Sequence, residues 1–399
     1  MYSFTRPQWL TLAVCAAIFA LGQFHRASGA IYAPILTDRF AASATLIGAL
    51  VSAMFLANIA AQLPFGTLLD RFGARRVVPA CLGLIAAGTA LFAFAGNVEG
   101  VLAARIAIGI GSAAMGAASH VIIASAFPAR DFGLVSGLVV TLGGIGGLLG
   151  TYPLAFALER LPWRVIFAAV AALTLALALA MPRLIAPQAA APEAALGGFR
   201  ALLALPRLRR ALALAFVTYA PIVTVTGLWG GPYLQEVTGL GPEAAGAVLF
   251  FLFGATILGG LIYGVLDRRF DARRGLIGVS VGASITCLAV LSLWPAPPAA
   301  LAIALLLGMV FAQQFYIPLG AEMRNAVPDG LLGRAASLFT LVAVAAIPVH
   351  QFGFGLVIDT AAAAGLQTEA QFRAGFGAMA ALIALCAAAF FLPLRPPQD

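Results

Sequence analysis

The chain has 399 residues, of which 62% are hydrophobic and only 10% are charged. Soluble domains carry about 25% charged residues, so this composition excludes a soluble globular protein and predicts a membrane protein. The net charge of +8 does not indicate nucleic-acid binding, because the basic residues, all of them arginine, lie mostly in short loops between apolar runs.

Twelve runs are long enough to cross a bilayer, because a spanning helix needs about 20 mostly apolar residues. In chain order the predicted spans are Trp9–Leu36, Thr45–Leu69, Val77–Ala95, Gly100–Phe127, Phe132–Leu158, Arg164–Ile185, Ala211–Glu236, Glu243–Leu266, Gly275–Trp294, Ala299–Val327, Arg334–Ile358 and Arg373–Leu394. Most joining loops are short, so neighbouring helices should be antiparallel. The sequence therefore predicts an all-α membrane protein with twelve transmembrane helices.

The stretch Ala186–Arg210 is the exception among the loops, because it is long and rich in alanine, proline and arginine. It predicts a cytoplasmic linker between an N-terminal six-helix bundle, residues 1–185, and a C-terminal six-helix bundle, residues 211–399. The halves carry prolines and glycines at corresponding places, as expected for two parallel repeats with substrate bound near the midplane.

Arginines divide unequally between the two sets of loops. Seventeen lie on the side of Arg6 and four on the opposite side, while Arg26 and Arg105 fall inside predicted spans. Cytoplasmic loops carry the excess of positive charge. The sequence therefore predicts a multi-pass protein of the bacterial inner (plasma) membrane with both termini in the cytoplasm.

A charged loop follows the second predicted span. Residues Gly66–Arg76 read GTLLDRFGARR, and a second charged run begins with Asp267 and Arg268 after the eighth span. The first loop resembles the pattern G-x-L-x-D-R-x-G-R-R between the second and third helices of the major facilitator superfamily (MFS). The segment Leu102–Ala114, reading LAARIAIGIGSAA, resembles the fourth-helix pattern of the same family and contains Arg105.

The resemblance covers the whole chain and implies a secondary transporter with two pseudo-two-fold-related bundles (the MFS fold), working by rocker-switch alternating access. It also implies a latch in which the acid of the first loop meets a helix N-terminus, holds the halves together and breaks on opening. The residues with this coupling or conformational role would be Asp70, Arg71, Gly73, Arg75, Arg105, Asp267 and Arg268. The alternative is that these charges only fix the topology.

Polar residues inside the spans are the candidates for substrate binding, because a charge at the bilayer centre costs about 2.5–3.5 kcal/mol on insertion scales. Arg26 is the leading candidate, and Gln23 lies one turn away on the same face. The further candidates are His25, His120, Tyr219, Thr224, Thr226, Trp229, Gln313, Gln314, Tyr316, His350 and Gln351.

Acids are scarce in the same regions. Glu322 is the only acid well inside a predicted span, and it is either an inter-helix ion pair or a proton carrier. A cavity with Arg26 and no central carboxylate would be positive, and a guanidinium binds carboxylates or phosphates bidentately. The sequence therefore predicts transport of a small organic anion, with proton coupling or exchange, by a monomer without catalytic residues, cofactor or resident metal.

Three alternatives remain open. A multidrug/proton antiporter would carry G-x-x-x-G-P in the fifth helix, but Pro153 follows Gly150 by three residues. A copper importer could use the histidines His25, His120 and His350, although their spacings show no ligand cluster. A membrane-embedded sensor or enzyme is the remote alternative, because the sequence shows no nucleophile–base pair and no phosphate-binding loop.

Overall fold

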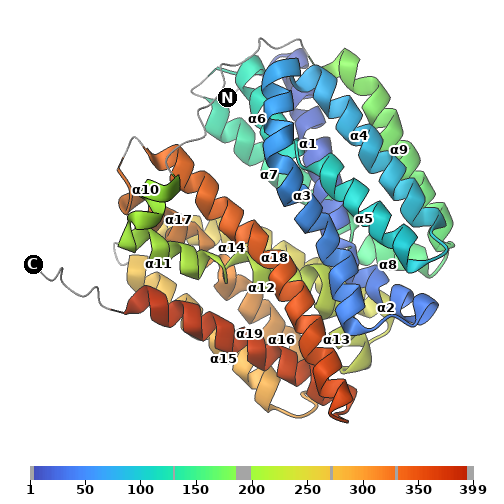
Figure 1. Ribbon diagram of the computed structural model, residues 1–399, viewed down its shortest axis with the longest axis vertical. Coiled ribbons are helices and arrows are strands. Elements are labelled where there is room, and N and C mark those ends of the chain that lie inside the picture. The colour runs from blue at the N-terminus through green and yellow to red at the C-terminus, as the bar shows by residue number, and fades with distance from the viewer. Residues whose placement is uncertain (1–3, 129–130, 186–198, 270–272, 329–330, 393–399) are drawn as a thin grey trace, which may run out of the picture. The chain divides into compact units, whose positions relative to one another are not determined.

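The structure is a computed structural model that describes residues 4–128, 131–185, 199–269, 273–328 and 331–392. All regular secondary structure in these ranges is helical (Figure 1). Twelve stretches, from Arg6–Ala27 to Thr368–Phe391, are long and apolar enough to cross a membrane. The predicted all-α fold with twelve transmembrane helices is therefore confirmed.

The chain divides into two compact units. The first unit consists of residues 1–42, 49–195 and 242–247, and the second consists of residues 43–48, 196–241 and 248–399. Residues 43–48 thus group with the second unit, although the helix that continues from them groups with the first. Residues 242–247 group with the first unit, although the helix that continues from them groups with the second. The predicted linker Ala186–Arg210 lies partly outside the described residues, and the bundle boundaries at 185 and 211 stay a prediction.

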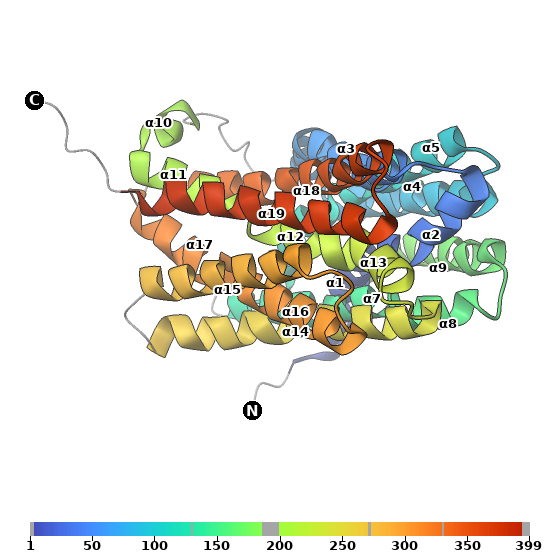
Figure 2. The ribbon, with the colours of Figure 1, turned by 90° about the horizontal axis from the view of Figure 1, so that it is seen from below.

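The first unit is built from nine helices among the described residues. They are α1 (Arg6–Ala27), α2 (Gly29–Phe40), α3 (Ala44–Phe72), α4 (Ala74–Phe94), α5 (Val98–Ser112), α6 (Met115–Ala126), α7 (Phe132–Leu149), α8 (Tyr152–Leu158) and α9 (Trp163–Leu184). Helix α4 packs against both α5 and α9, and α1 packs against α7 (Figures 1 and 2). A Cβ at Gly146 of α7 would collide with the backbone of Ala20 of α1. This glycine therefore permits the close approach of the two helices.

The second unit contains the remaining helices. They are α10 (Phe199–Ala204), α11 (Pro206–Ala215), α12 (Tyr219–Thr224), the π-helix η2 (Val225–Trp229), α13 (Gly230–Glu236), α14 (Pro242–Arg269), α15 (Arg273–Leu293), α16 (Ala299–Ala312), the 3₁₀-helix η3 (Gln313–Phe315), α17 (Tyr316–Asn325), α18 (Leu332–Ala363) and α19 (Thr368–Phe391). Helix α15 packs against α16 and α19 (Figure 2). The structure corrects the seventh span, which begins at Pro206 rather than at Ala211.

Two spans of the second unit contain irregular turns near prolines. Pro232 has no N–H to donate to the carbonyl of Leu228, four residues earlier. Leu228 lies in the π-helix η2, where the regular α-helical pattern is interrupted. Pro318 likewise offers no donor to Gln314, and the chain tightens there into the 3₁₀-helix η3. Mid-helix turns of these types often mark functional sites.

The connection between α3 and α4 is a single residue, Gly73. Its φ of 71° lies in the left-handed region, which a glycine adopts at no steric cost. The N–H of Gly73 donates to the carbonyl of Leu69 at 2.9 Å, and its own carbonyl accepts from the N–H of Val77 at 3.2 Å. Glycine is therefore needed here to end one helix and start the next.

Candidate functional site

Arg26 lies in the last turn of α1, just before the helix is interrupted at Ser28. Its side chain is half-buried, and its guanidinium carbon is 5.9 Å from the centroid of the Phe55 ring. Among the described residues no acid lies within ion-pair distance of Arg26. Gln23, one turn earlier, is also half-buried. The structure thus leaves the guanidinium of Arg26 available to a ligand.

Arg105 of α5 has different surroundings, because it is only 1% exposed. Its two terminal nitrogens donate to the carbonyls of His25 at 3.3 Å and Val51 at 3.2 Å. Its guanidinium carbon also lies 5.7 Å from the centroid of the Tyr32 ring. Arg105 therefore ties α5 to α1, α2 and α3 inside the first unit.

His25 belongs to the environment of Arg105 rather than to that of Arg26. Its ring is buried, and Nε2 lies 3.3 Å from the hydroxyl of Thr89. The last histidine of the first unit, His120 in α6, is exposed. The structure therefore does not bring His25, His120 and Arg26 together around one space.

In the second unit, α18 and the seventh span meet through buried polar groups. The indole N–H of Trp229 donates to the backbone carbonyl of Gln351 at 2.9 Å. The side-chain amide of Gln351 donates to the carbonyl of Val223 at 3.4 Å. The Trp229 ring also stacks on Phe354, with 5.6 Å between ring centroids. These contacts hold the irregular turn η2 against α18.

Several buried polar atoms near these turns have no hydrogen-bond partner among the described residues. They are the hydroxyl of Thr224, both amide atoms of Gln313 and Nε2 of His350. Helix α12, which carries Thr224, packs against both η3 and α18. A buried polar atom without a partner costs free energy unless something satisfies it. These unsatisfied atoms, called the polar cluster below, lie on α12 and on the two elements that pack against it.

The remaining candidates of the second unit differ in how well they are already satisfied. The hydroxyl of Thr226 donates to the carbonyl of Ile222 at 2.8 Å, and the amide of Gln314 donates to Val310 at 3.3 Å. Tyr219 and Tyr316 are both half-buried. Within the part of the chain that the structure describes, no group of three or more His, Cys, Asp or Glu side chains could hold a metal ion.

The charged loops can be placed only in part, because the side chains of Asp70 and Arg268 lie outside the described residues. In the first loop Arg71 is exposed, and Nε of Arg75 donates to the carbonyl of Pro182 at 2.9 Å. In the second loop Arg273 makes a two-pronged contact with Asp267, at 2.6 and 3.1 Å. The latch stays a prediction.

Two acids that contact the first residues of another helix were not among the candidates from the sequence. The carboxylate of Asp359 in α18 accepts from the backbone N–H groups of Ala44 at 3.0 Å and Thr45 at 2.8 Å. Glu243 of α14 accepts from the hydroxyl of Tyr152 at 2.9 Å. Helix starts leave backbone donors unpaired, but sequence spacing cannot show which distant acid reaches them.

Comparison with known proteins supports the family that the sequence motifs resemble. The profile of the Major Facilitator Superfamily matches residues 12–349. The chain is 29% identical over 160 residues to the "Uncharacterized transporter YybO" of Bacillus subtilis (strain 168), which is 40% of this chain and 37% of that protein. It is 26% identical over 163 residues to the "Riboflavin transporter RibZ" of Clostridioides difficile (strain 630), which is 41% of this chain and 36% of that protein.

Among solved structures, a bacterial homologue of the human lysosomal transporter Spinster superposes with a TM-score of 0.81 at 18% identity. The match covers 98% of this chain and 97% of that one. At this identity the likeness shows the fold alone. The matched segments span little more than a third of the two curated relatives.

The twelve candidate spans and the helical fold define a multi-pass membrane protein. The chain belongs to the Major Facilitator Superfamily, as its sequence motifs predicted.

Proposed function

We propose that this transporter moves a small organic anion across a bacterial inner membrane by rocker-switch alternating access. Proton coupling or exchange supplies the energy, the protein works as a monomer, and both termini lie in the cytoplasm. The observation that carries the proposal is the half-buried guanidinium of Arg26, which has no acid within ion-pair distance among the described residues.

An intramembrane cation without a counter-ion costs free energy. The anionic group of a substrate would remove that cost at the moment of binding, and a guanidinium would hold a carboxylate or phosphate through two parallel hydrogen bonds. Arg105 is a weaker candidate, because backbone carbonyls accept from both of its terminal nitrogens, although its Nε has no partner among the described residues. Arg26 is therefore the residue that selects for charge.

The polar cluster of the second unit supplies the second part of the proposal. Gln313 offers a donor and an acceptor, and His350 and Thr224 offer one unpaired polar atom each. Such groups suit hydroxyl, carbonyl or ring-nitrogen atoms of a substrate.

The test is a thermal-shift screen of the purified protein, because a ligand that binds the folded state raises its melting temperature. The screen compares carboxylates, phosphates, amino acids, cationic drugs, Cu⁺ and riboflavin, the last because the relative RibZ is named for it. We expect stabilisation by anions at micromolar to millimolar concentration. Stabilisation confined to cationic drugs or to copper would overturn the proposal in favour of an antiporter or a metal importer.

Energy coupling needs a separate measurement. The protein in proteoliposomes should accumulate the identified anion when a pH gradient is imposed, or exchange it for the same anion loaded on the other side. Uptake that an uncoupler collapses indicates proton coupling, and uptake that depends only on internal anion indicates exchange. Uptake that depends on neither would contradict this part of the proposal.

A further inference from the structure

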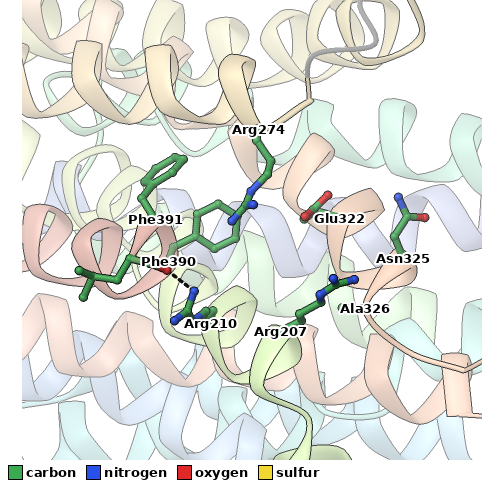
Figure 3. Close-up of a pocket in the computed structure, with 9 residues that line it drawn as sticks. Arg207, Arg210, Arg274, Glu322, Asn325, Ala326, Phe390 and Phe391 are labelled. Atoms are coloured by element: carbon green, nitrogen blue, oxygen red, sulfur yellow. Dashed lines mark hydrogen bonds between the residues drawn. The ribbon is translucent and has the colours of Figure 1, made fainter. Parts of the chain in front are cut away.

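A basic cavity of about 320 Å³ lies within the second unit, away from the polar cluster (Figure 3). It is lined by three arginines and one acid, together with an asparagine and apolar groups. The residues are Arg207, Arg210, Arg274, Glu322, Asn325, Ala326, Phe390, Phe391 and Leu392. With three cations and one carboxylate, the lining is cationic overall.

The cavity lies where four helices have their ends. Helices α11 and α15 begin beside it, at Pro206 and Arg273, and α17 and α19 end beside it, at Asn325 and Phe391. The loops on this side carry most of the arginines. The cavity therefore belongs at the membrane surface, on the side that the arginine distribution predicts to be cytoplasmic.

The charges of the cavity are not neutralised by one another. Arg207 is exposed, and neither Arg207 nor Glu322 has an ion pair within 4.0 Å among the described residues. Arg274 lies with its guanidinium carbon 5.5 Å from the centroid of the Phe390 ring, which Figure 3 shows beside it. Its chain neighbour Arg273, by contrast, is paired with Asp267. The cavity thus presents positive charge that an anion can satisfy.

The rim beside these cations is apolar and uncovered. Phe391 is 41% exposed and Leu392 is 59% exposed. Arg210 donates to the backbone carbonyl of Leu392, which fixes this rim next to the cationic lining (Figure 3). A ligand that matches both surfaces carries an anionic head and a hydrocarbon tail.

We propose that this cavity binds the phosphate headgroup of an anionic membrane phospholipid, with the acyl chains lying against Phe391 and Leu392. Basic pockets between transmembrane helices on the cytoplasmic side suit such headgroups, because that leaflet is rich in anionic lipid. Arginine matches a phosphate through two parallel hydrogen bonds. Glu322, on the same lining, repels the phosphate and sets an upper limit on the affinity.

The test measures lipid binding to the purified full chain in a zwitterionic detergent, by native mass spectrometry and by the shift in melting temperature. The probes are phosphatidylglycerol, phosphatidylcholine and inorganic phosphate at equal concentration. Phosphatidylglycerol should bind and stabilise, and phosphatidylcholine should not. Stabilisation by inorganic phosphate that phosphatidylglycerol does not exceed would show a soluble-anion site and overturn the lipid assignment.

Variants locate the site. R207Q combined with R274Q should weaken phosphatidylglycerol binding by about tenfold or more, since each arginine near a membrane surface contributes to the attraction. E322Q should strengthen it. The matched control is R209Q, because Arg209 is exposed on the same helix, between two lining arginines, and does not line the cavity.

The outcomes distinguish lipid binding in this cavity from non-specific attraction to the charged surface. Equal weakening in R209Q would overturn the proposal, and so would binding that is unchanged in both R207Q/R274Q and E322Q. Should the double variant fail to fold, E322Q decides alone, because only a phosphate held beside Glu322 gains from its removal. Failure here leaves the anion transport proposal standing, because Arg26 is not part of this cavity.

Discussion

Arg26 and Arg105 are two intramembrane arginines of one unit that lie in different surroundings. Arg105 is 1% exposed, and the carbonyls of His25 and Val51 accept one N–H group from each of its two terminal nitrogens, while its Nε has no partner among the described residues. Arg26 is half-buried, and its described contact is with the ring of Phe55. The difference lies in the partners supplied by neighbouring helices, and it is the basis of our proposal that Arg26 binds the ligand while Arg105 holds the unit together.

The largest expected effect is on ligand binding by Arg26 variants. R26A should weaken binding of the anion found in the screen by about 100-fold or more, because two charge-assisted hydrogen bonds are lost. R26K should recover part of the affinity, since it keeps the charge but not the planar fork. The measurement is a binding isotherm for each purified variant.

The melting temperature of R26A should be close to that of the wild type, because the only described contact that is lost is the one with the Phe55 ring. The control is R164A, which removes an exposed arginine at the start of α9. Wild-type affinity in R26A, or a variant that no longer folds, would make Arg26 a structural residue and remove the main support for an anionic substrate.

Arg105 should show the reverse pattern. R105A removes two hydrogen bonds and leaves a cavity between α5, α1 and α3, which should cost about 2–4 kcal/mol of stability. We expect a clearly lower melting temperature and, in the protein that remains folded, near-normal ligand affinity. Loss of affinity without loss of stability would show that the comparison is wrong and that Arg105 also contacts the ligand.

Gln313 and Gln351 of the second unit offer a similar comparison between an unpartnered and a partnered side chain, here with neutral groups. Both are fully buried, but the amide of Gln313 has no partner among the described residues, while Gln351 donates to the carbonyl of Val223. Q313L should leave the free energy of unfolding unchanged or raise it by up to about 1 kcal/mol, with a melting temperature that is equal or higher. The same substitution should impair transport. Q351L should lower the melting temperature. Equal destabilisation by both substitutions would count against a ligand site at Gln313.

The fold was predictable because each membrane span can be recognised from its own composition and apolar length, without knowledge of the other segments. Twelve spans and the family followed from such local signals, together with the loop at Gly73, whose φ of 71° requires glycine. The start of the seventh span was misplaced because Pro206–Arg210 is rich in arginine yet helical. Apolarity alone does not mark where a helix begins.

The candidate site was less predictable because partners come from other helices. Arg26 and Arg105 look alike in sequence, as cations in apolar runs, and only the carbonyls of α1 and α3 distinguish them. His25 was a substrate-binding candidate because it is a polar residue inside a predicted span, and the structure places its ring beside Thr89. Burial and hydrogen-bond partners, rather than residue type, decide which polar groups remain available.

The smallest expected effect concerns Asp359, which is a partnered charge like Arg105 but half-buried and near the end of α18. Its carboxylate accepts from the backbone N–H groups of Ala44 and Thr45 at the start of α3. Replacing a side chain that satisfies such donors with alanine typically costs about 1 kcal/mol. D359A should therefore lower the melting temperature by a few degrees.

D359N should have a smaller effect than D359A, because its amide oxygen can still accept one of the two N–H groups. The control is D38N, which changes an acid that is exposed at the end of α2. D359A, D359N and D38N are compared by thermal unfolding in the same detergent and salt. A D359A protein as stable as D38N would mean that solvent satisfies the start of α3 equally well. In that case hydrogen-bond partners would indicate that a charged side chain stabilises the fold only where, as for Arg105, the side chain is fully buried.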